Sequence, residues 1–283
     1  MMTGAPSLHS HVLTHTADDA VVQAYWDKRA VSYSCGVCEE LAGEMHAAWA
    51  AVLDEKTRSL RAAAASQNRH LRALDVGCGP GFFSILLSSL GCEVVAIDSS
   101  EDMLAAARRN AERDGASSIR FLHADAMDLS EAASSFDAIV SRNVTWLMKD
   151  LLAAYEEWQG LLRSGGKLLA FDANWYRYLV DPAVNARRLA DQAPSTDILG
   201  WDEDSLATDA QERACEQIAL ALPSTYLLRP YWDVHVLRDL GFSDVSVDVD
   251  ALNTLWTAGG AGLLRLLSVV LDRGDALTCP GPL

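Results

Sequence analysis

Leu71-Arg72-Ala73-Leu74-Asp75-Val76-Gly77-Cys78-Gly79-Pro80-Gly81 is the stretch that decides the fold of this 283-residue chain, and it leads directly into an apolar run at residues 82–90. An apolar run that ends in an acidic residue and is closed by alternating glycines predicts a buried strand, a tight turn and a helix start. Glycines let a ligand approach the backbone, and the N–H groups at a helix start favour polar or negative ligand groups. The stretch therefore predicts a nucleotide-cofactor site in an α/β fold.

Two details separate this turn from the dinucleotide fingerprint G-x-G-x-x-G. In that fingerprint the third glycine comes three residues after the second, but here Phe82 stands at that place and Gly81 comes one position early. Asp75 also places a carboxylate before the turn, where it suits a cationic ammonium group better than a pyrophosphate. The stretch resembles motif I of the class I S-adenosylmethionine (SAM)-dependent methyltransferases, an acidic residue followed by G-x-G-x-G.

The resemblance covers residues 26–178 and 232–249. It implies a Rossmann-like α/β fold, with a doubly wound, seven-stranded, mostly parallel sheet, N-terminal helices and a helical cap insertion. Apolar runs at residues 93–97, 119–123, 136–140 and 167–172 predict strands after the first, residues 242–249 alternate as a half-exposed strand does, and residues 263–271 fit either a final antiparallel strand or a helix.

The predicted organisation has four parts. Residues 1–16 are expected to be a disordered tail, 17–178 the SAM-binding core with N-terminal lid helices, 179–228 a substrate-cap insertion, and 229–283 the completion of the sheet. Within the core, residues 18–33 and 39–65 are predicted to be helices. The C-x-x-C pair Cys35 and Cys38 is predicted to lie in a loop between them.

Composition limits the partners. A formal net charge of −16 and a pI near 4.7 argue against a general affinity for nucleic acid or an anionic membrane. Six scattered cysteines suit reduced thiols, and neither a transmembrane span nor a secretory signal is evident. We expect a cytoplasmic protein with a small-molecule substrate and no bound metal. The sequence leaves the oligomeric state open.

Two downstream carboxylates extend the cofactor prediction. Asp98 ends the second apolar run, 21 residues after Gly77, the separation at which an acidic side chain meets ribose hydroxyls. Dinucleotide enzymes share that spacing. Asp125 begins a segment similar to the methyltransferase motif in which an acidic side chain receives the adenine amino group.

The resemblance further implies that Met103 packs on the adenine and that Trp26 and Tyr33 belong to a lid over the cofactor. It thus implies SAM as the cofactor. The candidate contacts are Trp26, Tyr33, Asp75, Gly77, Cys78, Gly79, Gly81, Asp98, Ser99, Met103, Asp125, Ala126, Met127, Ser141 and Arg142.

The exits of the fourth and fifth strands are the candidate places for the methyl acceptor, because ligands of open α/β sheets bind at the carboxyl ends of the strands. Asn143 follows the fourth strand, and Asp172 and Tyr176 lie at and after the end of the fifth. We expect these three side chains to orient a small-molecule acceptor with an N or O nucleophile. Methyl transfer from SAM is an in-line displacement, so positioning of that nucleophile is the main task of the enzyme.

Three other functions compete with this one. Cys35 and Cys38 could hold a thiol or metalloid acceptor for S-methylation, since thiolates prefer soft ions. A nicotinamide-dependent oxidoreductase would share the turn and Asp98. A module that binds SAM without transferring its methyl group would share every cofactor residue.

Overall fold

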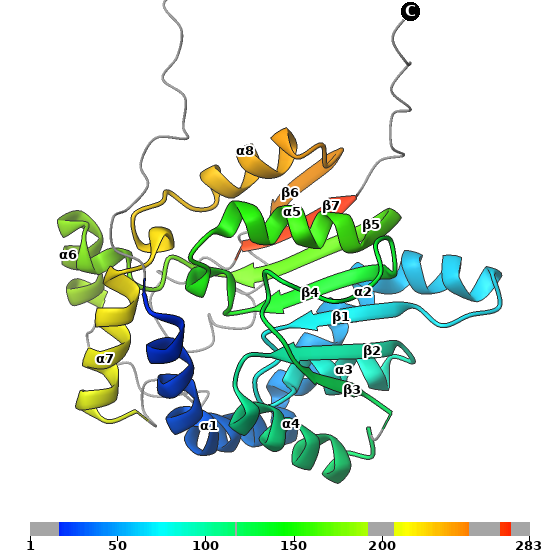
Figure 1. Ribbon diagram of the computed structural model, residues 1–283, viewed down its shortest axis with the longest axis horizontal. Helices are drawn as coiled ribbons and strands as arrows, with labels where there is room; N and C mark the ends of the chain where they lie inside the picture. Colours follow the sequence, from blue (N-terminus) through cyan, green and yellow to red (C-terminus); the bar gives the residue numbers. More distant parts are fainter. Residues whose placement is uncertain (1–16, 117, 192–206, 249–266, 273–283) are drawn as a thin grey trace, which may run out of the picture.

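The computed structural model describes residues 17–116, 118–191, 207–248 and 267–272, so the tail predicted for residues 1–16 lies outside them. The described strands form one sheet in the order β3-β2-β1-β4-β5-β7-β6 (Figure 1). Their bounds are β1 (Arg72–Val76), β2 (Glu93–Asp98), β3 (Arg120–His123), β4 (Phe136–Arg142), β5 (Leu162–Asp172), β6 (Asp244–Asp248) and β7 (Leu267–Asp272). The first five run parallel, whereas β7 is antiparallel to β5 and β6. Five parallel strands with flanking helices confirm the predicted Rossmann-like α/β class.

Helices cover both faces of this sheet. They are α1 (Asp19–Ala42), α2 (Glu44–Ser66), α3 (Phe82–Ser89), α4 (Glu101–Arg113), α5 (Leu151–Leu161), α6 (Pro182–Asp191), α7 (Asp209–Leu220) and α8 (Tyr231–Asp239), with 3-10 turns η1 (Thr145–Leu147), η2 (Arg177–Leu179) and η3 (Pro223–Thr225). Successive strand residues point to opposite faces. Val140 accordingly belongs to the apolar cluster of Trp49 in α2, whereas Ile139 belongs to the cluster of Trp158 in α5 and Leu237 in α8.

The N-terminal helices differ from the prediction. The loop expected at Cys35 and Cys38 is wrong, because α1 continues through both cysteines to Ala42. The intervening Gly36 is buried within α1, and this packing outweighs its weak helix propensity. The break comes instead at Gly43, where an added Cβ would lie only 3.0 Å from the carbonyl oxygen of Glu39.

The two last strands also settle one sequence-based alternative. Within the range 263–271, predicted to be a strand or a helix, residues 267–271 belong to β7, and residues 263–266 lie outside the described part. β6 falls within the range 242–249 predicted to be a strand. No helix in the described ranges is both long and apolar enough to pass through a lipid bilayer.

The strand order fixes where a ligand can bind. β1 lies between β2 and β4, so the chain crosses over in opposite directions on its two sides. In open α/β sheets this switch point opens a crevice at the carboxyl ends of the strands. The N-terminal part of α1 lies beside that edge in Figure 1, and there Trp26 packs in a third apolar cluster with Trp146 of η1 and Ile218 of α7.

Candidate active site

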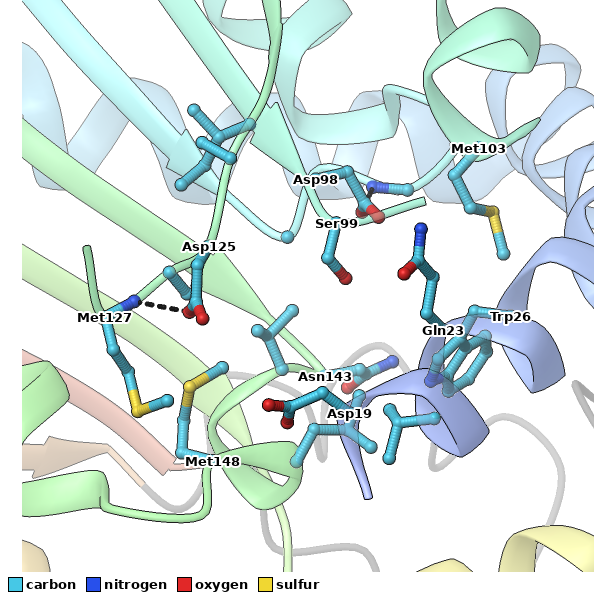
Figure 2. Close-up of a pocket in the computed structure, with 18 of the residues that line it drawn as sticks. Asp19, Gln23, Trp26, Asp98, Ser99, Met103, Asp125, Met127, Asn143 and Met148 are labelled. Carbon is cyan, nitrogen blue, oxygen red and sulfur yellow. Dashed lines mark hydrogen bonds between the residues drawn. The ribbon is translucent and has the colours of Figure 1, made fainter. Parts of the chain in front are cut away.

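A cavity of about 490 Å³ opens at the carboxyl ends of β1 to β4 and beneath the first turns of α1 (Figure 2). It is lined by Asp19, Val22, Gln23, Trp26, Tyr33, Gly77, Gly79, Ile97, Asp98, Ser99, Met103, His123, Ala124, Asp125, Ala126, Met127, Arg142, Asn143, Val144, Leu147, Met148 and Lys149. Its volume lies within the range of small-molecule and cofactor sites. Segments far apart in the sequence therefore converge on one site.

The glycine turn shapes the floor of the cavity. Gly77 has φ +64° and Gly79 has φ +50°, a backbone region that side-chain-bearing residues rarely occupy. A Cβ on Gly77 would lie 2.4 Å from Cγ2 of Val144, whereas a Cβ on Gly79 would meet nothing nearer than Tyr33 at 3.9 Å. Gly77 is thus required for packing, and Gly79 leaves its backbone open to a ligand. Cys78 and Gly81 do not line the cavity.

Asp98 stands at the end of β2 with its carboxylate directed to the glycine turn. Oδ2 accepts a hydrogen bond from the backbone N–H of Gly79 at 2.8 Å, and Oδ1 accepts one from Ser100 at 2.9 Å. Burial raises the pKa of Asp98, and these two N–H groups oppose that rise. Each carboxylate oxygen can accept a second hydrogen bond, so Asp98 both fixes the turn and presents acceptors to the cavity.

Asp125 lies at the next strand exit and is exposed to the cavity. Its Oδ1 accepts the backbone N–H of Met127 at 2.9 Å (Figure 2). The same turn carries Ala126, whose carbonyl oxygen accepts the indole N–H of Trp158 at 2.8 Å. These bonds hold the Asp125 carboxylate and the adjacent backbone in a fixed arrangement at the cavity.

Helix α1 contributes two aromatic rings. Trp26 and Tyr33 meet edge to face with ring centroids 5.8 Å apart, and both line the cavity. Within the described residues, the buried indole Nε1 of Trp26 has no hydrogen-bond partner. Buried donors are normally paired, so this N–H fits a site that receives an acceptor from a ligand.

Asp75 lies beneath the turn and outside the cavity lining. It is 2% exposed, and its Oδ2 accepts a hydrogen bond from Ser84 Oγ at 2.5 Å. Burial raises the pKa of the Asp75 carboxyl to about 7, although the Ser84 hydrogen bond works against the shift. Asp75 does not line the cavity, so the direct ammonium contact predicted for it stays a prediction.

Arg142 lines the cavity while its guanidinium holds α1. It donates to both carboxylate oxygens of Glu40, at 2.9 and 2.6 Å, and Glu40 is 5% exposed. The same guanidinium lies 4.9 Å from the ring centroid of Phe82. The preceding Ser141 is buried and does not line the cavity.

Residues 74–170 match the family model described as a methyltransferase domain. The chain therefore contains a SAM-dependent methyltransferase domain of class I. A ubiquinone biosynthesis O-methyltransferase from Ruegeria sp. strain TM1040 is 40% identical over 96 residues, which are 34% of this chain and 38% of that protein. A malonyl-acyl-carrier-protein O-methyltransferase from Enterobacter lignolyticus is 39% identical over 103 residues, 36% of this chain and 39% of that one.

The matched segment thus spans about two fifths of the length of these relatives. Among solved structures, a Nostoc punctiforme protein named as an O-methyltransferase aligns with a TM-score of 0.53 and 16% identity, over 87% of this chain and 60% of that chain. This likeness supports the methyltransferase fold.

SAM is the cofactor of this methyltransferase family, and the cavity fits it. SAM offers ribose hydroxyls and an adenine amino group as donors and a carboxylate as acceptor. The cavity presents the complementary groups, namely the carboxylates of Asp98 and Asp125, the unpartnered N–H of Trp26 and the open backbone at Gly79.

Of the three residues expected to orient the acceptor, only Asn143 lines the methyltransferase cavity. Asp172 is 1% exposed, and its carboxylate accepts hydrogen bonds from Thr145 Oγ1, the Trp146 backbone N–H at 2.9 Å and Trp175 Nε1 at 2.8 Å. The structure thus turns this carboxylate toward η1 and not toward the cavity.

Tyr176 lies behind η1 as well. Its hydroxyl is 3.0 Å from Sγ of Cys215, and its ring centroid is 4.8 Å from that of Trp146. Neither Asp172 nor Tyr176 is in the wall of the described cavity, so direct contact of these two residues with an acceptor stays a prediction.

Sequence reasoning missed several residues that the methyltransferase cavity brings together. Asp19 and Gln23 precede Trp26 by seven and three positions on α1, a spacing that puts them on one helix face. That periodicity could have identified them. Met148 and Lys149 follow η1 at the end of a loop without a motif, and no sequence signal pointed to them.

Proposed function

We propose that this methyltransferase transfers the methyl group of SAM to an N or O nucleophile of a small molecule. The observation that carries the proposal is one cavity that joins the glycine turn, both acidic strand ends and a further wall not needed for the nucleoside. That wall comes from the start of α1 and the loop after β4, and it provides space for a second ligand.

In this proposal each cofactor group has a partner. Asp98 accepts the ribose hydroxyl protons through its remaining lone pairs, and Asp125 accepts the adenine amino group. Met103 packs against the base, and the backbone at Gly79 lies against the aminoacyl end. The indole N–H of Trp26 donates to the carboxylate of that end.

The chemistry supplied by SAM is a methyl group on a positively charged sulfur, which needs a well-placed nucleophile more than an acid or base. The protein's contribution is therefore positional. Asn143 presents its amide from a backbone with φ +58°, at the β4 exit where the acceptor is expected. α1 shields the site from water, because Trp26 packs against Trp146 with ring centroids 6.5 Å apart.

Oxygen is the favoured nucleophile within this proposal. Both curated relatives described above are named O-methyltransferases, although the match includes only about a third of this chain. We further propose that residues 179–228, of which 192–206 lie outside the described part, act as a cap over the acceptor, since α7 packs on α1. We also propose that the protein acts in the cytoplasm, in keeping with described cysteines that form no disulfide.

The thiol or metalloid alternative has less support. Cys35 is exposed on α1, and Cys38 receives a hydrogen bond from Arg113 at 3.1 Å. Neither cysteine lines the cavity. A Cys35→Ser, Cys38→Ser double variant should therefore keep full methyl transfer, and loss of turnover in it would favour the alternative.

Calorimetry with S-adenosylhomocysteine, followed by mass spectrometry of metabolite extracts incubated with SAM, tests the proposal. We expect binding in the micromolar range or tighter and a mass gain of one methyl in a small molecule. Asp98→Ala should weaken binding at least tenfold through lost charge-assisted hydrogen bonds, and Asp102→Ala on the exposed start of α4 is the matched control. Binding without transfer to any acceptor would indicate the non-catalytic module.

A further inference from the structure

The cavity has two chemically different ends. In Figure 2, Asp98, Ser99 and Met103 lie on one side, and Asp19, Asn143 and Met148 lie on the other. The first side carries the proposed nucleoside contacts. If the proposed function holds, the second side, formed by the start of α1 and the loop after β4, faces the acceptor.

This acceptor side contains an ion pair between two residues of the cavity lining. Lys149 Nζ lies 2.5 Å from Asp19 Oδ2, and both residues line the cavity. The side chain of Asp19 is 69% exposed, whereas that of Lys149 is 30% exposed. The carboxylate is thus largely in solvent, and the ammonium group belongs to the more enclosed wall.

Arg142 also brings a positive charge to the cavity lining, but its ion pair is buried. Arg142 is held by the buried carboxylate of Glu40 through two hydrogen bonds. Removing that partner would leave a buried charge without compensation. Lys149 can exchange its partner at far lower cost, because exposed ion pairs contribute little.

Because the Asp19 carboxylate is more exposed than the Lys149 ammonium group, the pair favours one sign of ligand charge over the other. A ligand anion that displaces Asp19 from Lys149 returns a mostly exposed carboxylate to water. A ligand cation that displaces Lys149 from Asp19 leaves the more enclosed ammonium group without a partner, beside the incoming charge and the cofactor's positive sulfur. Both effects favour an anion.

The acidic neighbours of this pair do not reverse the preference. Asp18 accepts the Ala20 N–H at 2.9 Å as the cap of α1, and Asp150 accepts the Ala153 N–H at 3.0 Å as the cap of α5. Neither carboxylate lines the cavity. Each is already committed to a helix N-terminus, where a negative charge is favourable.

Apolar side chains complete the acceptor side. Val22 comes from α1, and Leu147 and Met148 come from the segment around η1. This wall suits a hydrophobic body next to the charged group. We propose that the acceptor is a small amphipathic carboxylic acid, with its carboxylate bound by Lys149 in place of Asp19 and its apolar part against Leu147 and Met148.

Three probes that share a benzyl body and differ in charge test this inference: phenylacetate, phenylacetamide and phenethylamine. Their affinities are measured by ligand-observed NMR on protein saturated with S-adenosylhomocysteine. Phenylacetate should bind at least tenfold more tightly than phenylacetamide. Lys149→Gln should remove that preference and leave phenylacetamide binding unchanged, whereas Lys149→Arg should restore it, because a charge-assisted bond is retained.

Two further variants sharpen the test. Asp19→Asn should tighten phenylacetate binding several-fold by removing the competing carboxylate. Lys28→Gln, on the exposed surface of α1, should change nothing. Equal affinity for the three probes, absence of binding by all of them, or tightest binding of phenethylamine would overturn the inference. Failure to bind S-adenosylhomocysteine would instead contradict the proposed function on which the inference rests.

Discussion

Arg229→Met should destabilise the protein by about 3–5 kcal/mol, the usual cost of removing one partner from a buried ion pair. Arg229 and Asp233 are 4% and 0% exposed. The Arg229 Nε donates to Asp233 Oδ2 at 2.9 Å, and Nη2 donates to Thr145 Oγ1 at 2.7 Å. Although burial alone would lower it, the pKa of Arg229 is held above its ordinary value by Asp233 and other neighbours, so methionine would leave buried negative charge uncompensated.

The cost should not rise above this range, because each carboxylate keeps other donors. Asp233 Oδ1 still accepts the Tyr155 hydroxyl at 2.7 Å, and Asp172 still accepts the Trp146 backbone N–H. A domain of this kind has a total stability of roughly 5–15 kcal/mol. The variant should therefore fold, with a clearly lower urea midpoint.

Urea unfolding followed by tryptophan fluorescence measures the change. Arg238→Met, an exposed position on α8, is the matched control and should stay within about 0.5 kcal/mol of the wild type. Adding Asp233→Asn to Arg229→Met should recover at least half of the loss, because the uncompensated charge is removed while Tyr155 keeps an acceptor. A loss below about 1 kcal/mol, or no recovery in the double variant, would refute the reasoning.

Three other perturbations test the site and helix α1. The pKa of Asp75 is about 7 in the folded protein against 3.8 in the unfolded chain, so the native state binds more protons between these values and its stability falls as pH rises from about 4 to 7. Asp75→Asn should flatten this part of a urea-unfolding pH series. An unchanged slope would contradict the raised pKa of the buried Asp75 carboxyl. Gly77→Ala should weaken S-adenosylhomocysteine binding more than tenfold in calorimetry, because the added Cβ would lie 2.4 Å from Val144 Cγ2. Adding Val144→Ala should restore part of the affinity. Wild-type affinity in the single variant would disprove the steric argument. Glu40→Gln should lower hydrogen-exchange protection along α1, because Arg142 loses its buried counter-ion, and unaltered protection would show that the pair does not hold the helix.

Local sequence patterns were enough to predict the fold class and to single out Gly77, Gly79, Asp98 and Asp125, all of which line the cavity. These residues follow short motifs or strand ends, and a strand–helix–strand unit has a nearly fixed length. Their shared position at the cavity could therefore be predicted without knowledge of distant contacts.

Long-range pairing explains most of what the sequence did not reveal. Asp172 ends a strand beside the expected ligand edge, but Arg229, far along the chain, lies 3.7 Å from its carboxylate. Glu40 looked like one more polar residue of a helix until the structure paired it with Arg142, 102 positions away. Ion pairs between residues so far apart in the sequence depend on tertiary packing, which neither periodicity nor spacing encodes.

The buried contacts behind η1 matter for protein engineering. Ser224 Oγ donates to the carbonyl oxygen of Trp146 at 2.5 Å, and Arg229 donates to Thr145, so residues outside the matched range 74–170 support a wall inside it. A chimera joined at residue 170, where the match ends, would take the cavity wall around η1 from one parent and the residues that hydrogen-bond to it from another. Recombination libraries for this family should therefore keep residues 143–149 and 223–233 on the same parental fragment.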